Sequence, residues 1–269
     1  MSPLAELAER PLAGGNLSTV VRVGETVRRG PRPGSAAVHG LFRLLEAREF
    51  DGAPRFLGID ERGREILSFI PGEVGAYPLP AYMWSDLALT DIARLLRRYH
   101  DATAGYTPPP GATWQFVYPD ASRHEVICHN DVAPYNAVFM DGRPRALIDF
   151  DEAGPGPRSW DIAYALYTFV PLASWAPRPA GATASYDAAT DALQRVRRTR
   201  LFCVAYGCRW DDELLETVER RLEAMCARLI ERAANGDAAY RRLIAEAHLD
   251  YYRGEIAFLR RRTGEWRAS

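Results

Sequence analysis

The feature that most constrains this chain is a short polar segment between apolar runs. Residues 128–139 read CHNDVAPYNAVF, and residues 146–151 read ALIDFD. The apolar letters around the polar ones are typical of short buried strands. A fold that buries these strands holds three polar side chains beside them in a fixed order: Asp131, then Asn136 five residues later, then Asp149 at the end of the second run.

This order of polar groups fits the demands of phosphoryl transfer. The reaction asks little covalent chemistry of a protein and depends on in-line positioning and charge neutralisation. One carboxylate has to accept or orient the proton of the acceptor hydroxyl, while an amide oxygen and another carboxylate hold Mg²⁺, which prefers oxygen ligands. Asp131, Asn136 and Asp149 supply such a set. A single Asp in a turn is usually a cap or a surface charge, so the prediction depends on the joint spacing.

The rest of the chain divides into a strand-rich part and a helix-rich part. Before the Pro71–Gly72 break we expect strands and one helix, and after it helices dominate around a few short strands. The predicted strands are 17–24, 25–30, 55–60, 64–70, 125–128, 137–140 and 146–150. The predicted helices are 35–47, 84–104 and a series from residue 160 onward, interrupted by a loop at 177–183. Within 211–233, an apolar stripe predicts core packing rather than a ligand surface: Leu215, Val218, Leu222, Cys226, Leu229 and Ala233.

The two polar motifs resemble the signature of the aminoglycoside phosphotransferase family, relatives of the protein kinases. The similarity lies in HNDVAPYN at 129–136 and in IDFD at 148–151. The resemblance implies an α+β, bilobal protein-kinase-like fold, with a small β-rich N-lobe at 1–71 and a larger, mostly helical C-lobe at 72–269. It also implies that ATP or GTP binds between the lobes as the phosphate donor.

The same resemblance implies a role for each motif residue. Asp131 is the expected catalytic base, and Asn136 and Asp149 are the expected Mg²⁺ ligands. Asp151 is expected to assist with a second Mg²⁺ or to order the loop. Two further motif residues are expected to support the catalytic loop rather than to react: His129 and Asp161.

The nucleotide side of the site carries weaker signals. Gly15 and Asn16 stand in a glycine-containing turn before the first strand and are candidates for covering the phosphates. Residues 67–70 look like the hinge whose backbone pairs with adenine. Ser68 and Ile70 are therefore candidate nucleotide contacts.

The chain contains no lysine, and all 34 basic side chains are arginines. An arginine must therefore replace the lysine that kinases place on their third strand, and a guanidinium can grip phosphate with two hydrogen bonds. Arg28 is the first candidate and Arg29 the second, since strand alternation points only one of them inward. The glutamate that pairs with that lysine has no clear equivalent: Val38 or His39 stands at its expected place, and Glu46 lies further along.

The composition argues against several other classes of function. The 34 arginines face 35 acidic residues, for a formal net charge of −1, which gives no sign of nucleic acid binding. No run of eighteen apolar residues predicts a membrane span, and the first fifteen residues lack the pattern of a secretory signal. The four cysteines show no metal-ligand spacing and are expected to be reduced thiols. We therefore expect a cytoplasmic protein.

The acceptor is expected to be a small hydroxylated molecule that binds against the C-terminal helices. A cationic aminoglycoside calls for an acidic pocket, yet residues 200–269 contain 12 acidic and 13 basic side chains. A local acidic cluster of Asp161, Asp250 and Glu255 is one alternative. Stacking of a nucleoside or sugar on aromatic side chains is another, with these candidates: Trp160, Tyr164, Trp210, Tyr251 and Tyr252. The sequence does not choose between an antibiotic and a metabolite.

Two classes of function remain open at this stage. One is a small-molecule kinase, for antibiotic resistance or metabolism. The other is a kinase-like immunity protein that binds and sequesters a small molecule without turnover. The set of Asp131, Asn136 and Asp149 favours the enzyme, whereas the missing lysine favours the binder. A protein kinase is disfavoured because only eleven residues separate Asp149 from Asp161, too few for an activation segment.

Overall fold

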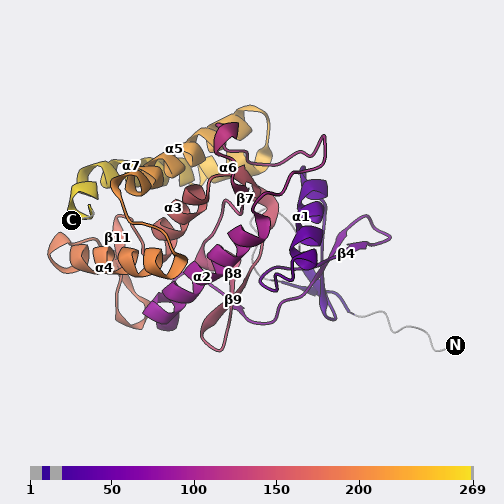
Figure 1. Ribbon diagram of the computed structural model, residues 1–269, viewed down its shortest axis with the longest axis horizontal. Coiled ribbons are helices and arrows are strands. Elements are labelled where there is room, and N and C mark those ends of the chain that lie inside the picture. Colours follow the sequence, from indigo (N-terminus) through magenta and orange to yellow (C-terminus); the bar gives the residue numbers. More distant parts are fainter. Residues whose placement is uncertain (1–7, 13–19, 268–269) are drawn as a thin grey trace.

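The computed structural model describes residues 8–12 and 20–267 of the chain. A small sheet with one helix against it lies at the amino-terminal end of the long axis, and a larger helical part fills the rest (Figure 1). The sheet is antiparallel, with strand order β1-β2-β3-β5-β4. Its strands are β1 (Arg10–Pro11), β2 (Val20–Val23), β3 (Thr26–Arg29), β4 (Phe56–Ile59) and β5 (Glu65–Ser68).

The sequence predicted most of this small part. Helix α1 (Ser35–Ala47) has the predicted bounds and buries the apolar side that the pattern indicated, with Leu41 and Leu45 almost fully enclosed. The hairpin of β2 and β3 turns at Gly24, whose φ of 59° suits glycine. The predicted strand 17–24 is observed from Val20, because residues 17–19 lie outside the described residues.

Hydrogen bonding changes partners just after β5. Strand β6 (Glu73–Val74) pairs not with the first sheet but with β8 (Ala137–Met140), in a three-stranded sheet β6-β8-β9. Between the two sheets, Gly72 has a φ of 143°, and a Cβ there would meet the carbonyl oxygen of Phe139. A glycine is therefore needed where the chain passes from the small part to the large one.

The strands of the larger part carry the polar motifs. Strand β9 (Arg143–Leu147) pairs with β8, and β7 (Val126–Cys128) pairs with β10 (Gly154–Gly156). The predicted strand 146–150 is wrong in its position: β9 ends at Leu147, because Asp149 adopts a left-handed conformation that ends extended pairing.

Helices cover these strands. They are α2 (Asp86–Thr103), α3 (Arg158–Phe169), α4 (Ala188–Tyr206), α5 (Asp212–Ala234), α6 (Ala238–Ala245) and α7 (His248–Arg262). Ser85 starts α2 by accepting the backbone N–H of Ala88 at 3.1 Å. Helix α5 packs against α3, α6 and α7, while α2 packs against α4. The loop predicted at 177–183 instead joins a short hairpin of β11 (Trp175–Pro177) and β12 (Thr183–Ser185).

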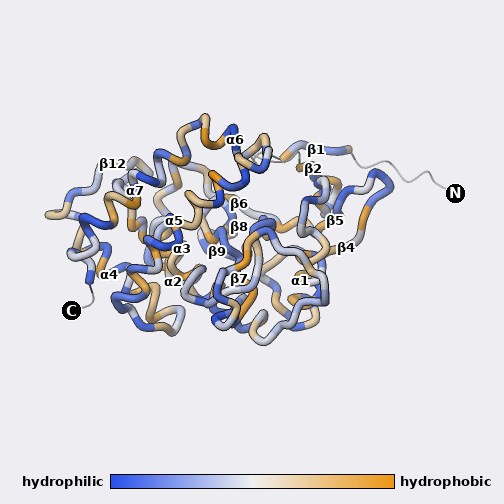
Figure 2. Tube along the Cα trace, turned by 90° about the horizontal axis from the view of Figure 1, so that it is seen from above, coloured by the Kyte–Doolittle hydropathy of each residue, from blue (hydrophilic) through white to orange (hydrophobic). Residues whose placement is uncertain are grey.

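The core lies among these helices and under the strands of the motifs. Apolar residues of α2, α3 and α5 belong to one buried cluster, and the tube in Figure 2 shows apolar and polar residues interspersed along these helices. The predicted stripe on α5 is confirmed as core packing, with Ala233 only partly buried at its end. None of the helices in the described residues is long and apolar enough to cross a membrane.

Candidate active site

The loop that the sequence predicts to be catalytic, residues 129–136, joins β7 to β8 and is anchored by Asp161. Asp161, in the first turn of α3, accepts the backbone N–H of His129 at 2.6 Å and that of Asn130 at 2.7 Å. Its Oδ2 also lies 3.1 Å from Nε2 of His100 on α2. All four residues are buried. The expectation that Asp161 holds the loop is confirmed.

The anchoring carboxylate is ionised in spite of its burial. Burial alone would raise the pKa of Asp161, but the hydrogen bond and charge of His100 and the backbone N–H of His129 bring the pKa below its usual value. A buried carboxylate with this many donors favours one arrangement of the loop.

His129 connects the catalytic loop to the strand that precedes Asp149. Its Nε2 lies 3.0 Å from the carbonyl oxygen of Ile148, and its Nδ1 accepts the backbone N–H of Asp131 at 3.3 Å. Burial lowers the pKa of His129. A neutral ring with its proton on Nε2 satisfies both contacts. The prediction that His129 supports the loop is thus confirmed.

Two non-glycine residues of the site have left-handed backbones. Asn130 has a φ of 65° and Asp149 a φ of 62°. Such positions cost on the order of 1 kcal/mol each and persist where the surroundings determine them. For Asn130 two hydrogen bonds hold this conformation. Its side-chain amide donates to the backbone carbonyl oxygen of Glu152 at 2.9 Å, and its backbone carbonyl oxygen accepts from the buried guanidinium of Arg221.

The carboxylate of Asp131 is held at both oxygens. Oδ1 accepts the hydroxyl of Tyr135 at 2.8 Å, and Oδ2 accepts the side-chain amide of Asn136 at 2.7 Å. Burial raises the pKa of Asp131 to about 6, with a further contribution from the charge of Asp149, although the hydrogen bond from Tyr135 acts in the opposite direction. The group can therefore accept a proton near neutral pH.

Asn136 and Asp149 are brought together by the β8–β9 hairpin. The carbonyl oxygen of Asn136 accepts the backbone N–H of Ile148 at 2.9 Å, which places the residue before Asp149 beside Asn136. The side-chain amide nitrogen of Asn136 donates to Asp131, so the side-chain amide oxygen of Asn136 is the atom left to bind a metal. The Asp149 side chain is 47% exposed.

This donor set fits Mg²⁺. Within the described residues, no group of three or more His, Cys, Asp or Glu side chains is arranged to hold a metal. Mg²⁺ at phosphate sites commonly takes only one or two protein oxygens and completes its shell with phosphate and water. Two hard oxygen donors, Asn136 and Asp149, match that habit.

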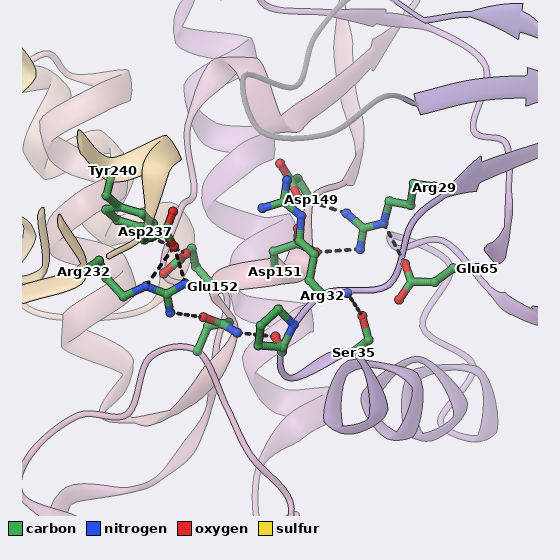
Figure 3. Close-up of polar contacts among 12 residues, drawn as sticks. Arg29, Arg32, Ser35, Glu65, Asp149, Asp151, Glu152, Arg232, Asp237 and Tyr240 are labelled. Carbon is green, nitrogen blue, oxygen red and sulfur yellow. Dashed lines mark hydrogen bonds and ion pairs between the residues drawn. The ribbon is translucent and has the colours of Figure 1, made fainter. Parts of the chain in front are cut away.

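Arg29, and not Arg28, points into the site. Its guanidinium lies 2.8 Å from Glu65, 3.3 Å from Asp149 and 2.6 Å from Asp151 (Figure 3). Burial would lower the pKa of Arg29, but these carboxylates raise it above its usual value.

Arg28 lies on the other face of the strand. It donates to the hydroxyl of Thr26 at 2.6 Å and is 3.9 Å from Asp60. In the structure Val27 packs toward the core, and the period of two along a strand puts Arg29 on the same side.

The partner of the inward arginine comes from a strand rather than from α1. Glu65 stands opposite Arg29 in the register of β3 and β5, and its side chain is 1% exposed. His39, one of the positions considered for this partner, instead bonds to Glu65 with Nε2 2.7 Å from Oε1. Sequence reasoning missed Glu65 because it searched along the helix; the pairing register of two short strands was the information required.

The remaining predicted nucleotide residues are only partly described. Gly15 and Asn16 lie outside the described residues. Ser68 closes β5, and its hydroxyl accepts the backbone N–H of Arg55 at 2.8 Å. Ile70 follows on the connector and is partly exposed. Their role as nucleotide contacts stays a prediction.

A cavity of about 210 Å³ lies beside these ion pairs, between the two parts of the molecule (Figure 3). Arg32 closes it from the amino-terminal side and pairs with Asp151 at 2.9 Å. Glu152 and Arg232 face it from the other side, and Arg232 pairs with Asp237 at 2.7 Å. Sequence reasoning did not indicate these residues, since they come together only where Arg228 of α5 and Tyr240 of α6 contact Glu152.

Comparisons with known proteins agree with this geometry. A family model described as "Phosphotransferase enzyme family" matches residues 83–202, which include the catalytic loop, Asp149 and Asp161. The macrolide 2'-phosphotransferase MphH from Brachybacterium faecium has a TM-score of 0.52 at 18% identity, covering 89% of this chain and 91% of that one. The resemblance to the aminoglycoside phosphotransferase family is confirmed. The predicted kinase-like α+β fold is confirmed with it.

Two further proteins are similar to this chain. APH(2")-IIa has a TM-score of 0.58 in its gentamicin complex, at 13% identity over 93% of this chain and 92% of that one. In its ternary complex with streptomycin and ATP the score is 0.51, at 13% identity over 87% and 89%. The trifolitoxin immunity protein of Rhizobium leguminosarum bv. trifolii is 42% identical over 160 residues, 58% of this chain. The match spans only 60% of that relative's length.

The acidic cluster considered for an aminoglycoside does not form. Asp161 is buried under the catalytic loop. Glu255 is buried and accepts the backbone N–H of Ser174 at 2.8 Å, whereas Asp250 points outward and lies 3.7 Å from Arg253. This chain therefore has the fold of the aminoglycoside phosphotransferases without that set of carboxylates for a polycation.

Proposed function

We propose that the protein transfers the γ-phosphate of ATP or GTP to a hydroxyl of a small molecule, with Mg²⁺ as cofactor. The observation that carries the proposal is the held carboxylate of Asp131, bonded to Asn136 in a loop that is anchored beside Asp149. The family match over the same residues supports it. A reaction that uses a nucleoside triphosphate also supports a cytoplasmic location.

In this proposal Asp131 is the base. A carboxyl group with a pKa of about 6 is mostly ionised at pH 7, yet it accepts a proton more readily than an ordinary aspartate. As the acceptor oxygen bonds to the γ-phosphorus and the bond to the leaving diphosphate breaks, the hydroxyl proton passes to Asp131. The bonds from Asn136 and the loop anchor hold the carboxylate in place, so that little motion is needed at the moment of transfer.

Asn136 and Asp149 would hold Mg²⁺, which supplies charge neutralisation for the phosphates when bound. We propose that Arg29, rather than Arg28, takes the part of the kinase lysine. Its guanidinium already donates to the carboxylates of Asp149 and Asp151, and phosphate oxygens can accept the same kind of hydrogen bond as these carboxylate oxygens. Glu65 keeps it oriented from within the sheet.

A second function stays open because of one observation, the 42% identity to an immunity protein over 160 residues. A kinase-like chain that captures a toxic small molecule would protect a cell without modifying that molecule. The ion pairs of Arg29 with Asp149 and Asp151 fit this alternative as well. They pair the carboxylate proposed to bind Mg²⁺, Asp149, with a side chain of the protein itself.

A mass-spectrometric screen separates the two functions. Hydroxylated antibiotics, nucleosides and sugars are incubated with the protein and either ATP or GTP, and a gain of one phosphate is sought. Asp131→Ala should reduce transfer by about 10²–10⁴-fold while Mg-nucleotide binding stays nearly intact; Asp149→Ala should impair both. Glu61→Ala, at an exposed turn carboxylate, serves as the control. Normal turnover by Asp131→Ala would refute the mechanism, and nucleotide binding without any modification would favour sequestration.

A further inference from the structure

A chain of tyrosines begins at the catalytic aspartate. The Tyr135 hydroxyl, which donates to Asp131, lies 3.0 Å from the hydroxyl of Tyr164. The Tyr164 ring stacks on Tyr167 with centroids 6.0 Å apart, and the Tyr167 hydroxyl donates to that of Tyr251 at 3.2 Å. Hydrogen bonds and ring contacts thus connect the base to the surface of α7 without a break.

The outer members of this chain form an exposed surface. Tyr251 accepts the indole N–H of Trp175 at 3.2 Å and packs against Tyr252 at 5.4 Å between centroids. Tyr77 meets the Trp175 ring edge-on at 5.9 Å. We call Tyr77, Tyr135, Trp175, Tyr251 and Tyr252 the aromatic ledge. Tyr77, Tyr135 and Tyr251 are 47%, 39% and 45% exposed.

The segment that carries Tyr77 lies against the catalytic loop. The backbone N–H of Gly75 donates to the carbonyl oxygen of Pro134 at 3.0 Å, and a Cβ on Gly75 would meet Pro134. The ledge is therefore built from the connector after β6, the catalytic loop, β11 and α7. Four segments distant in sequence thus contribute to the ledge, and the hydroxyl of Tyr135 links it to Asp131.

The ledge presents rings rather than charges. Burial and the nearby charge of Asp131 raise the pKa of Tyr252, so its hydroxyl stays protonated. Glu255, on the same helix, is turned inward to Ser174, and Asp250 is paired with Arg253. Exposed tyrosine and tryptophan rings at a site favour planar partners, because stacking combines apolar burial with a favourable ring geometry.

Tyr135 shows how an acceptor would meet the base. Its phenolic hydroxyl donates to Oδ1 of Asp131, the contact that an acceptor hydroxyl must make before transfer. Resting on the function proposed above, we propose that the acceptor is an alcohol with a planar aromatic ring. The ring lies on the aromatic ledge, and the alcohol hydroxyl replaces that of Tyr135 at Asp131.

Binding without nucleotide tests the ring preference. The probe is 2-(2-naphthyl)ethanol, compared with its non-aromatic counterpart 2-cyclohexylethanol and with gentamicin, in calorimetric titrations. Tyr77→Leu and Tyr251→Leu should each weaken binding of the naphthyl alcohol about tenfold, since one ring contact is worth about 1.4 kcal/mol. Tyr106→Leu, at a ring whose hydroxyl lies beside Gly40 of α1, should leave binding unchanged. Absent binding, equal binding of the cyclohexyl alcohol, or unchanged affinity in both ledge variants would overturn the proposal.

A Tyr135→Phe variant tests the displacement. Removal of the hydroxyl frees Oδ1 of Asp131 while the ring remains, so the naphthyl alcohol should bind several-fold more tightly; equal or weaker binding would contradict the displacement. These titrations are independent of turnover. Ledge-dependent binding without phosphate transfer would contradict the proposed kinase activity but support the aromatic ledge as a binding surface. Phosphorylation of gentamicin by a protein that does not bind the naphthyl alcohol would support the kinase activity and contradict the proposal of an aromatic acceptor.

Discussion

Replacement of Arg29 by methionine tests the arrangement of the small sheet most directly. The change leaves Glu65, whose side chain is 1% exposed, with the imidazole of His39 2.7 Å away but without its guanidinium partner. Removal of one member of a buried ion pair costs about 3–5 kcal/mol, because the other charge stays buried. Asp151 keeps Arg32, and Asp149 is 47% exposed, so these two contribute little to the loss. We expect a decrease of about 3 kcal/mol in the free energy of unfolding.

Arg28→Met is the matched control. Arg28 neighbours Arg29 on the same strand, and its only close carboxylate among the described residues is Asp60 at 3.9 Å. The expected decrease is below about 1 kcal/mol. Urea unfolding with linear extrapolation measures both values. All six tryptophans lie at or after Trp84, so tryptophan fluorescence does not report on unfolding of the small sheet. Hydrogen exchange of the backbone amides of β3 and β5 therefore has to be measured as well.

Two further measurements sharpen this test. Glu65→Gln should recover part of the stability lost in Arg29→Met, because it removes the unpaired charge. The pKa of Glu65 is lowered: burial would raise it, but the charge of Arg29 and the hydrogen bonds from Ser35, His39 and Arg29 together outweigh that effect. Its contribution is therefore present above the unfolded pKa, about 4.3, and is lost as the pH falls through the lower folded value. Equal losses in Arg28→Met and Arg29→Met, or no recovery with Glu65→Gln, would refute the reasoning.

Two other substitutions test the frame of the site. Asp161→Asn should lower the free energy of unfolding by about 2–3 kcal/mol, since an amide cannot accept from both loop N–H groups and from His100 as the carboxylate does. Thermal unfolding measures this loss, and an unchanged stability would contradict the anchoring role of Asp161. Gly72→Ala should cost about 1–3 kcal/mol, because a Cβ would meet the Phe139 carbonyl at a φ of 143°. Gly30→Ala, with no atom within 4 Å of its Cβ, is the control for the same urea titration, and equal losses would exclude the steric explanation.

The sequence predicted elements whose pattern is local. Helix α1 and the stripe on α5 follow from apolar spacing alone, and the motif around Asp131 follows from its flanking strands. Asp161 was assigned its supporting role through resemblance, and the hydrogen bonds to His129 and Asn130 agree.

Features that depend on pairing between distant segments were beyond sequence reasoning. The choice of Arg29 over Arg28 required the phase of a four-residue strand, and Glu65 required the register of β3 against β5. The end of β9 at Leu147 was missed because an apolar run cannot reveal that Asp149 leaves the strand with a positive φ. The aromatic ledge was visible only as scattered tyrosines until α7 and β11 were placed beside the catalytic loop.

The origin of Glu65 on a strand has a consequence for regulation. In protein kinases the glutamate that orients the phosphate-binding lysine sits on a helix, and displacement of that helix switches the enzyme off. Here the cation and its carboxylate are neighbours in one hydrogen-bonded sheet. An outward swing of α1 would break the contact of His39 but leave Arg29 and Glu65 joined. The pairing of Arg29 with Glu65 is thus independent of where α1 lies.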